Sequence, residues 1–184
     1  MALKAKYLKI EPMTEKAFEP FGDILGALSR KPDREVNNNI SWWSNFECTG
    51  KVNVSYVKYL YHHPPTDYEL TRVSQHKNVT QAIIPLEAKP SVFICAPPTP
   101  WGVKPPLDSF RAFLLDGTAG VVMKKLCWHT LGAPAVYIVN PPSFSIIDIS
   151  ELATQNELRK PGPYRYTFEV NLPETYNAII KVKW

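Results

Sequence analysis

The sequence predicts an all-β barrel or sandwich with a few short helices, and three features of its 184 residues support this fold class. The 18 prolines outnumber the 8 glycines, which implies many short elements joined by turns. Short runs rich in β-branched and aromatic residues alternate with turn signals, as in barrels and sandwiches. The chain contains four proline pairs, Pro64-Pro65, Pro97-Pro98, Pro105-Pro106 and Pro141-Pro142. Neither the interior of a helix nor a central strand tolerates proline, so these pairs mark loops. The length suits one domain, which we expect to span residues 1–184.

The N-terminal third predicts two strands, one helical turn and one long loop. Tyr7–Ile10 is typical of a short strand, and Thr14 is a suitable N-cap for a helix that ends near Phe18. Ser29–Asn39 is polar and ends in three asparagines, so we expect little regular structure there. Val52–Tyr61 alternates apolar and polar residues for most of its length, which is the signature of a half-buried strand.

The rest of the chain predicts a succession of short strands separated by turns. We expect strands at Tyr68–Ser74, Thr80–Pro85, Ser91–Ala96, Phe110–Leu115, Gly120–Lys124, Ala135–Val139, Ile146–Ile149, Tyr164–Val170 and Ala178–Lys183. Asp116-Gly117 predicts a hairpin between two of them, because glycine accepts the positive φ of a tight turn. Ser150–Arg159 is a candidate for a short helix.

Charge and composition argue against several classes of protein. The net charge of +4 is small and basic residues are mixed with acidic ones, so we do not expect nucleic-acid binding. The apolar runs are far shorter than the roughly 20 residues of a membrane helix, and the N-terminus lacks the apolar region of a secretory signal. Cys48, Cys95 and Cys127 include no CxxC pair, which favours free thiols in the core of a cytoplasmic protein.

Few residues offer catalytic chemistry. The adjacent His62 and His63 would point to opposite faces of a strand, and no HxH, HExxH or CxxC motif occurs, so we expect no bound metal and no cofactor. The serine elbow, the Walker loop and the dinucleotide fingerprint are also absent. Of the other two histidines, His129 is either a core residue beside Trp128 or an acid–base group, and His76 opens an apolar stretch.

The segment from Gly117 to His129 resembles the second motif of cupins, in which a histidine at the start of a strand points into a barrel. Read together, four stretches resemble the ureidoglycolate lyase family, whose members are cupin-fold enzymes of allantoin degradation in purine catabolism: Phe18–Leu25, His76–Pro85, Phe110–Phe113 and Gly120–His129. The resemblance covers roughly Tyr7 to Pro141. It implies a cupin-like double-stranded β-helix barrel, a homodimer, and a reaction that splits ureidoglycolate into glyoxylate and urea.

The resemblance also implies the site residues. Carried over position by position, it singles out His76, Gln81, Arg111 and His129. The chain departs from the family pattern at Ser74, where the family usually has glutamate, and at Lys124, where it usually has histidine. Both changes remove a group that could bind a metal or transfer a proton. A lysine is a poor metal ligand, but it can anchor a carboxylate.

Ureidoglycolate is a hemiaminal, so its elimination requires a base for the hydroxyl proton, an acid for the departing urea nitrogen, and a partner for the carboxylate. His129 is the candidate acid–base group, because an imidazole with an ordinary pKa of about 6.5 works in both directions near neutrality. His76 is the second proton-transfer candidate. The candidates for substrate binding are Lys124, Arg111, Gln81 and Trp128.

Some of these assignments have structural alternatives. Arg111 could instead form a salt bridge with Asp108 or Asp116, and Gln81 could be an ordinary polar residue of a strand. Met123 and Lys124 must point to opposite faces of their strand, and we expect Lys124 to face the cavity while Met123 packs outside the barrel.

Two other functions remain open from the sequence. One is a metal-free cupin that cyclises, isomerises or dehydrates a hydrophobic small molecule, which would use Trp42, Trp43, Trp101 and Trp128 near the mouths of the barrel. The other is a catalytically silent cupin that only binds a small molecule, since a fold does not fix a function.

Overall fold

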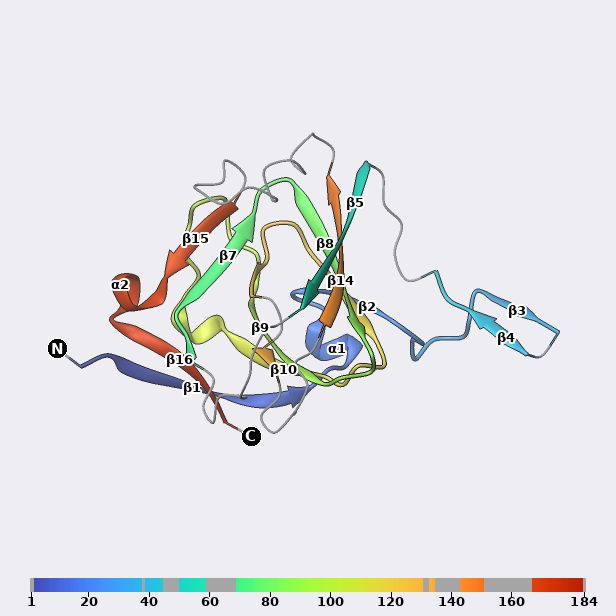
Figure 1. Ribbon diagram of the computed structural model, residues 1–184, viewed down its shortest axis with the longest axis horizontal. Helices are drawn as coiled ribbons and strands as arrows, with labels where there is room; N and C mark the ends of the chain where they lie inside the picture. Colours follow the sequence, from blue (N-terminus) through green and yellow to red (C-terminus); the bar gives the residue numbers. More distant parts are fainter. Residues whose placement is uncertain are drawn as a thin grey trace.

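The computed structural model describes residues 2–37, 39–44, 50–58, 69–130, 133–134, 143–150 and 167–183. The described residues form a long curled β-sheet, a second sheet that faces part of it, a small projecting hairpin and a few helical turns (Figure 1). The expected strand at Ala135–Val139 and the expected helix at Ser150–Arg159 lie outside these residues. In the described part of the chain, no helix has the length and apolar character required to cross a membrane.

The long sheet carries most of the strands. In spatial order its strands are β15 (Thr167–Asn171), β7 (Arg72–His76), β12 (Trp128–His129), β9 (Ser91–Ala96), β10 (Arg111–Leu115), β1 (Lys4–Pro12), β16 (Ala178–Lys183) and β6 (Glu69–Leu70), with β13 (Ala133–Pro134) also paired to β9. Strand β1 runs parallel to both of its neighbours, whereas the other pairs are antiparallel.

The second sheet is antiparallel and lies against the middle of the long one. Its strands, in order, are β2 (Gly22–Leu25), β11 (Gly120–Met123), β8 (Val79–Leu86), β14 (Ser143–Ser150) and β5 (Lys51–Lys58). The hairpin of β3 (Arg34–Val36) and β4 (Ile40–Trp42) projects away from the body of the molecule (Figure 1). The helical turns are α1 (Glu15–Phe18), α2 (Leu172–Tyr176) and the 3-10 turn Leu107–Ser109.

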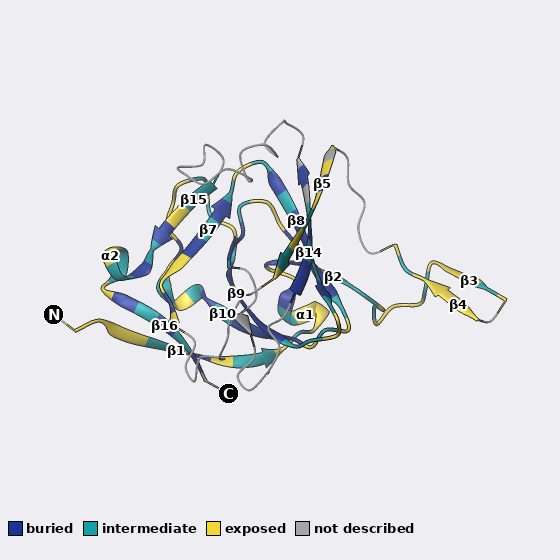
Figure 2. Ribbon diagram, viewed as in Figure 1, coloured by how far each residue is buried: buried dark blue, intermediate teal, exposed yellow. Residues whose placement is uncertain are grey.

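Strand β9 is buried along its whole length, because its two faces contribute to two different cores (Figure 2). On one face, Phe93 and Cys95 join an inner core, which lies between the two sheets and includes Phe113, Ile83 and other apolar residues. On the other face, alternate residues join an outer core, which the two ends of the curled long sheet enclose. Side chains that alternate along a strand therefore belong either to the barrel interior or to this outer core.

The predicted fold class is confirmed. The described residues are mostly strands, their helices are short, and the curled sheets are consistent with a cupin-like β barrel. The N-cap at Thr14 is also confirmed, since its Oγ1 accepts a hydrogen bond from the amide of Ala17 at 3.2 Å. The single-domain expectation stays a prediction.

One local expectation is wrong, and the structure refines another. Gly117 has the positive φ of 94° that a tight turn requires, but the strands on either side of it, β10 and β11, join different sheets and form no hairpin. The segment Ser29–Asn39, where little regular structure was expected, contributes the three-residue strand β3 to the projecting hairpin.

Candidate active site

His129 lies in the barrel interior. It is the cross-strand neighbour of Ser74 on β7 and of Cys95 on β9, so its side chain lies on the inner face of the long sheet. Its imidazole stacks on the ring of Phe93, with centroids 6.4 Å apart, and the residue is only 6% exposed. A histidine in this position meets the second sheet rather than solvent.

Both ring nitrogens of His129 face oxygen acceptors. Nδ1 lies 3.0 Å from the carbonyl oxygen of Cys127, and Nε2 lies 2.6 Å from Oε1 of Gln81, which reaches across from β8. An imidazolium donates to both oxygens at once. A neutral ring keeps its proton on Nδ1, and Gln81 must then turn its NH₂ group towards Nε2. The surroundings of His129 thus provide hydrogen bonds for its protonated form.

His76 completes a histidine pair. It follows Ser74 by two residues on β7 and therefore points to the same inner face, where its ring centroid lies 5.2 Å from that of His129. Its Nδ1 lies 3.0 Å from Oγ1 of Thr167. Burial, and then the positive charge of His129, lower the pKa of His76 to about 3. His76 is therefore uncharged near neutral pH, and the pair carries at most one positive charge, on His129.

Arg111 lies on the same inner face but has structural partners. Across β12, β9 and β10, His129, Cys95 and Arg111 are successive cross-strand neighbours, which places Arg111 roughly 10 Å from His129 on the spacing of strands. Its guanidinium lies over the ring of Phe113, 4.8 Å from the centroid. Arg111 does form a salt bridge, as the structural alternative predicted, but its partner is Glu11 rather than Asp108 or Asp116.

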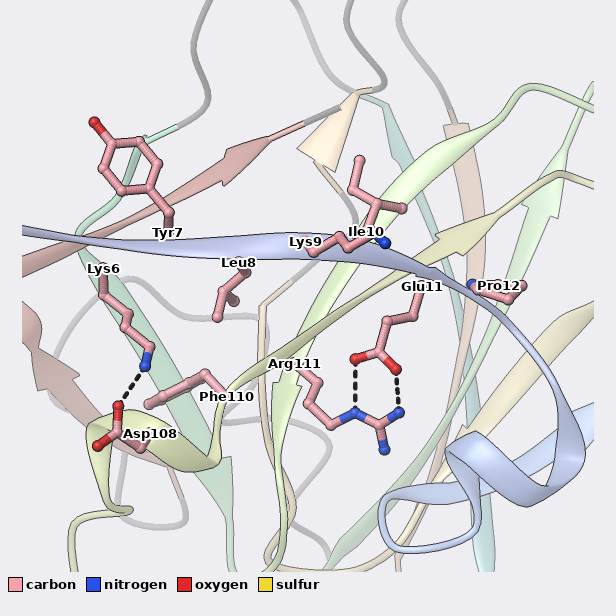
Figure 3. Close-up of a pocket in the computed structure, with 10 residues that line it drawn as sticks. All are labelled: Lys6, Tyr7, Leu8, Lys9, Ile10, Glu11, Pro12, Asp108, Phe110 and Arg111. Atoms are coloured by element: carbon pink, nitrogen blue, oxygen red, sulfur yellow. Dashed lines mark hydrogen bonds and ion pairs between the residues drawn. The ribbon is translucent and has the colours of Figure 1, made fainter.

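The contacts of Arg111 hold three elements together. Nε donates to Glu11 of β1 at 2.8 Å, Nη2 donates to the other oxygen of that carboxylate, and Nη1 donates to the carbonyl of Ala17 in α1 at 2.9 Å (Figure 3). Hydrogen bonding to Arg111 also lowers the pKa of Glu11. The two residues line a groove of about 470 Å³ along β1, and Asp108, at the other end of this groove, pairs with Lys6 (Figure 3). Because these contacts occupy the guanidinium, Arg111 is not available to bind the carboxylate of a substrate.

The expected orientation of Lys124 is wrong. Strand β11 ends at Met123, whose side chain is 1% exposed and packs in the inner core. Lys124 is exposed, and its Nζ donates to the carbonyl oxygen of Glu19. Because Met123 takes the inward position, the next residue points outward. The structure therefore gives no support to Lys124 as a substrate-binding residue.

Trp128 is also separated from the histidine pair. It belongs to the outer core, where it is fully buried, packs against Phe168 and donates from Nε1 to Oγ1 of Thr99 at 2.7 Å. Neighbouring residues of a strand point to opposite faces, so Trp128 and His129 cannot contact the same small molecule inside the barrel.

Trp42, Trp43 and Trp101, which lie within the described residues, do not gather around one cavity. Trp42 is 62% exposed on the projecting hairpin, and Trp43 donates to the carbonyl of Arg30. Trp101 packs against Phe168 on the outer side of the long sheet. These tryptophans therefore do not form the aromatic cavity that was expected to bind a hydrophobic substrate.

Metal ligands do not converge within the described residues, where no three His, Cys, Asp or Glu side chains are grouped to hold an ion. His62, His63 and Cys48 lie outside the described residues. Cys95 and Cys127 are buried free thiols, and burial raises the pKa of both, so they serve as packing residues.

Two residues near the site escaped the sequence analysis. Asn53 on β5 is 5% exposed and lies two strands from Gln81, since both are cross-strand neighbours of Asp148. Thr167 on β15 contacts His76. The alternation of apolar and polar residues around Asn53 was visible in the sequence but misleading. It suggested that the apolar side chains are buried and that Asn53 faces solvent. Thr167 had no local signal.

Comparisons with known proteins identify the same family that the four stretches of the sequence resemble. A family model described as ureidoglycolate lyase matches residues 5–161. The chain is 28% identical over 177 residues to the ureidoglycolate lyase of Burkholderia mallei, with 92% of each chain covered. It is 32% identical over 147 residues to that of Rhodobacter capsulatus, with 77% of this chain and 85% of the relative covered. Most of the chain is thus accounted for by one family, and the protein belongs to the ureidoglycolate lyase family.

Proposed function

We propose that this protein is a lyase that splits ureidoglycolate into glyoxylate and urea, a step of allantoin degradation in the cytoplasm. The observation that supports this best is the buried pair of His129 and His76, with ring centroids 5.2 Å apart and Gln81 beside it. Membership of the family supplies the substrate, since its named relatives are ureidoglycolate lyases.

The histidine pair balances the protons of the elimination. In the starting state His129 carries the proton and His76 is neutral. As the bond between carbon and urea nitrogen breaks, His129 protonates the departing nitrogen and His76 accepts the proton of the hydroxyl group. The pair begins and ends with one positive charge, which passes from His129 to His76. The hydroxyl oxygen becomes the carbonyl oxygen of glyoxylate.

The electrostatic coupling of the two rings favours this exchange. His76 is a weak base while His129 is charged, because that charge is one of the two causes that lower its pKa. When His129 gives up its proton, the repulsion disappears and His76 becomes more basic. Gln81 contacts His129 directly, so we assign to it the hydrogen bonds that orient the ureido group. Arg111 is assigned a structural role through Glu11 and Ala17.

The proposal is tested by urea release. Purified protein incubated with ureidoglycolate should release urea and glyoxylate in equal amounts, at a rate well above spontaneous breakdown. Heat-denatured protein is the control for that background reaction. A folded protein that releases no urea above the background would contradict the proposal and would favour a silent, ligand-binding cupin, which a thermal-shift screen with ureidoglycolate can detect.

We also propose that the protein is a homodimer. Two elements each expose more than one large apolar side chain: Ile40 and Trp42 on the projecting β4, and Val52, Val54 and Tyr56 on the edge strand β5 (Figure 2). An isolated two-stranded hairpin is only marginally stable in water. Covering both patches with a second copy would remove this apolar surface from water.

Light scattering is expected to give twice the mass of the chain at micromolar concentration. Trp42→Ser should weaken the dimer, because it removes the most exposed aromatic side chain of the hairpin. Val103→Ser is the matched control, since Val103 is similarly exposed, at 51%, but lies outside both patches. A parent protein that is monomeric at this concentration would refute the proposal.

A further inference from the structure

Strand β15 lies beyond the part of the chain that the family model matches. The match ends at residue 161, and β15 begins at Thr167. It pairs with β7 along its whole length, in a register that places Thr167 opposite His76 and Asn171 opposite Arg72. The strand that carries His76 is therefore not at the edge of its sheet, because β15 covers it.

The outer face of β15 anchors the strand. Phe168 packs against Trp128 and Trp101, with ring centroids 5.8 and 6.0 Å apart, and Val170 is buried in the outer core. Alternation then directs Thr167 to the inner face, on the side of the histidine pair. The position of its hydroxyl group is fixed by these contacts as well as by backbone pairing.

The hydroxyl of Thr167 contacts the ring of His76 directly. Its Oγ1 lies 3.0 Å from Nδ1. A threonine hydroxyl can donate or accept, so the contact is compatible with either tautomer of a neutral imidazole. The proposed elimination distinguishes the two, because His76 must accept a proton on Nε2 and can do so only if its own proton is on Nδ1.

We propose that Thr167 is a positioning residue that accepts a hydrogen bond from Nδ1–H of His76 and so keeps Nε2 unprotonated. The catalytic consequence rests on the proposed function. The tautomer itself is a property of the free protein, so it can be measured whatever the substrate is. A hydrogen bond to one ring nitrogen is the usual way in which a protein selects the tautomer of a histidine.

The direct test is the ¹⁵N NMR spectrum of His76 at neutral pH. In the parent, Nδ1 should give a protonated signal and Nε2 an unprotonated one. Thr167→Val keeps the shape of the side chain but removes the hydroxyl, and should shift the ratio of tautomers by roughly three- to tenfold. Thr167→Ser should restore the parent spectrum. Thr80→Val, the same change on β8 beside Gln81, should leave it unchanged.

Kinetics provide the second readout. Thr167→Val should lower kcat for ureidoglycolate by about three- to tenfold with little change in KM, and Thr167→Ser should recover most of the loss. The inference is overturned if the parent carries the proton on Nε2, or if Thr167→Val leaves the ratio of tautomers unchanged. If the parent releases no urea, the proposed function fails, and the NMR spectra still decide the role of Thr167.

Discussion

Replacing His129 with asparagine is expected to lower kcat for ureidoglycolate by about a hundredfold or more. Asparagine is similar in width and can still hydrogen-bond to the carbonyl of Cys127 or to Gln81, so the barrel should stay folded. It cannot carry a proton to the departing urea nitrogen. The loss should therefore appear in kcat, while KM changes little.

A second measurement on the same variant does not depend on turnover. Removing His129 removes the positive charge that contributes to the low pKa of His76, so this pKa should rise from about 3, and NMR titration can follow it. Burial, the larger cause, remains, so the pKa should stay below its ordinary value. Lys124→Met is the matched control, because it removes an exposed cation and should leave kcat and KM within about twofold of the parent. Turnover by His129→Asn at the parent rate would refute the acid–base assignment.

The positions of the strands could be predicted from the sequence better than the faces they bury. Val52–Tyr61 was expected as a half-buried strand, and β5 occupies the described part of it. Its apolar residues Val52, Val54 and Tyr56 are the exposed ones, however, and Asn53 is buried. Periodicity indicates that two faces differ, but it does not say which face a second element covers. That depends on pairing with β14, about 90 residues further along the chain.

The same limit applies to the site. His76, Gln81 and His129, which the resemblance singles out, lie together in the structure, at the end of β7, on β8 and on β12. Lys124 was misassigned because Met123, the last residue of β11, takes the inward position instead, and the following turn, with a positive φ at Leu126, directs the chain back towards β12. The contacts Glu11–Arg111 and Thr167–His76 join residues about 100 positions apart. Such contacts arise from sheet topology, for which one sequence carries no local signal.

Replacing Phe113 with alanine is expected to have the largest effect on stability, because this ring fills the centre of the inner core. Phe113 is fully buried, and its ring contacts Phe18 and Phe21 edge to face, with centroids 5.5 and 5.4 Å away. The guanidinium of Arg111 lies over its face. Truncation of a buried phenylalanine typically lowers the free energy of unfolding by about 3 to 5 kcal/mol.

A loss of that size corresponds to a fall of roughly 6 to 20 °C in Tm for a chain of this length, and denaturant unfolding or calorimetry can measure it. Phe113→Leu is the matched control. It keeps most of the volume, should cost less than about 1.5 kcal/mol and should lose mainly the aromatic contacts. The effect should also reach the site, because Phe93, on which His129 stacks, is the cross-strand neighbour of Phe113. Phe113→Ala with the stability of the parent would show that this ring is not packed between the two sheets, and the inner core that holds the histidine pair would then have to be placed elsewhere.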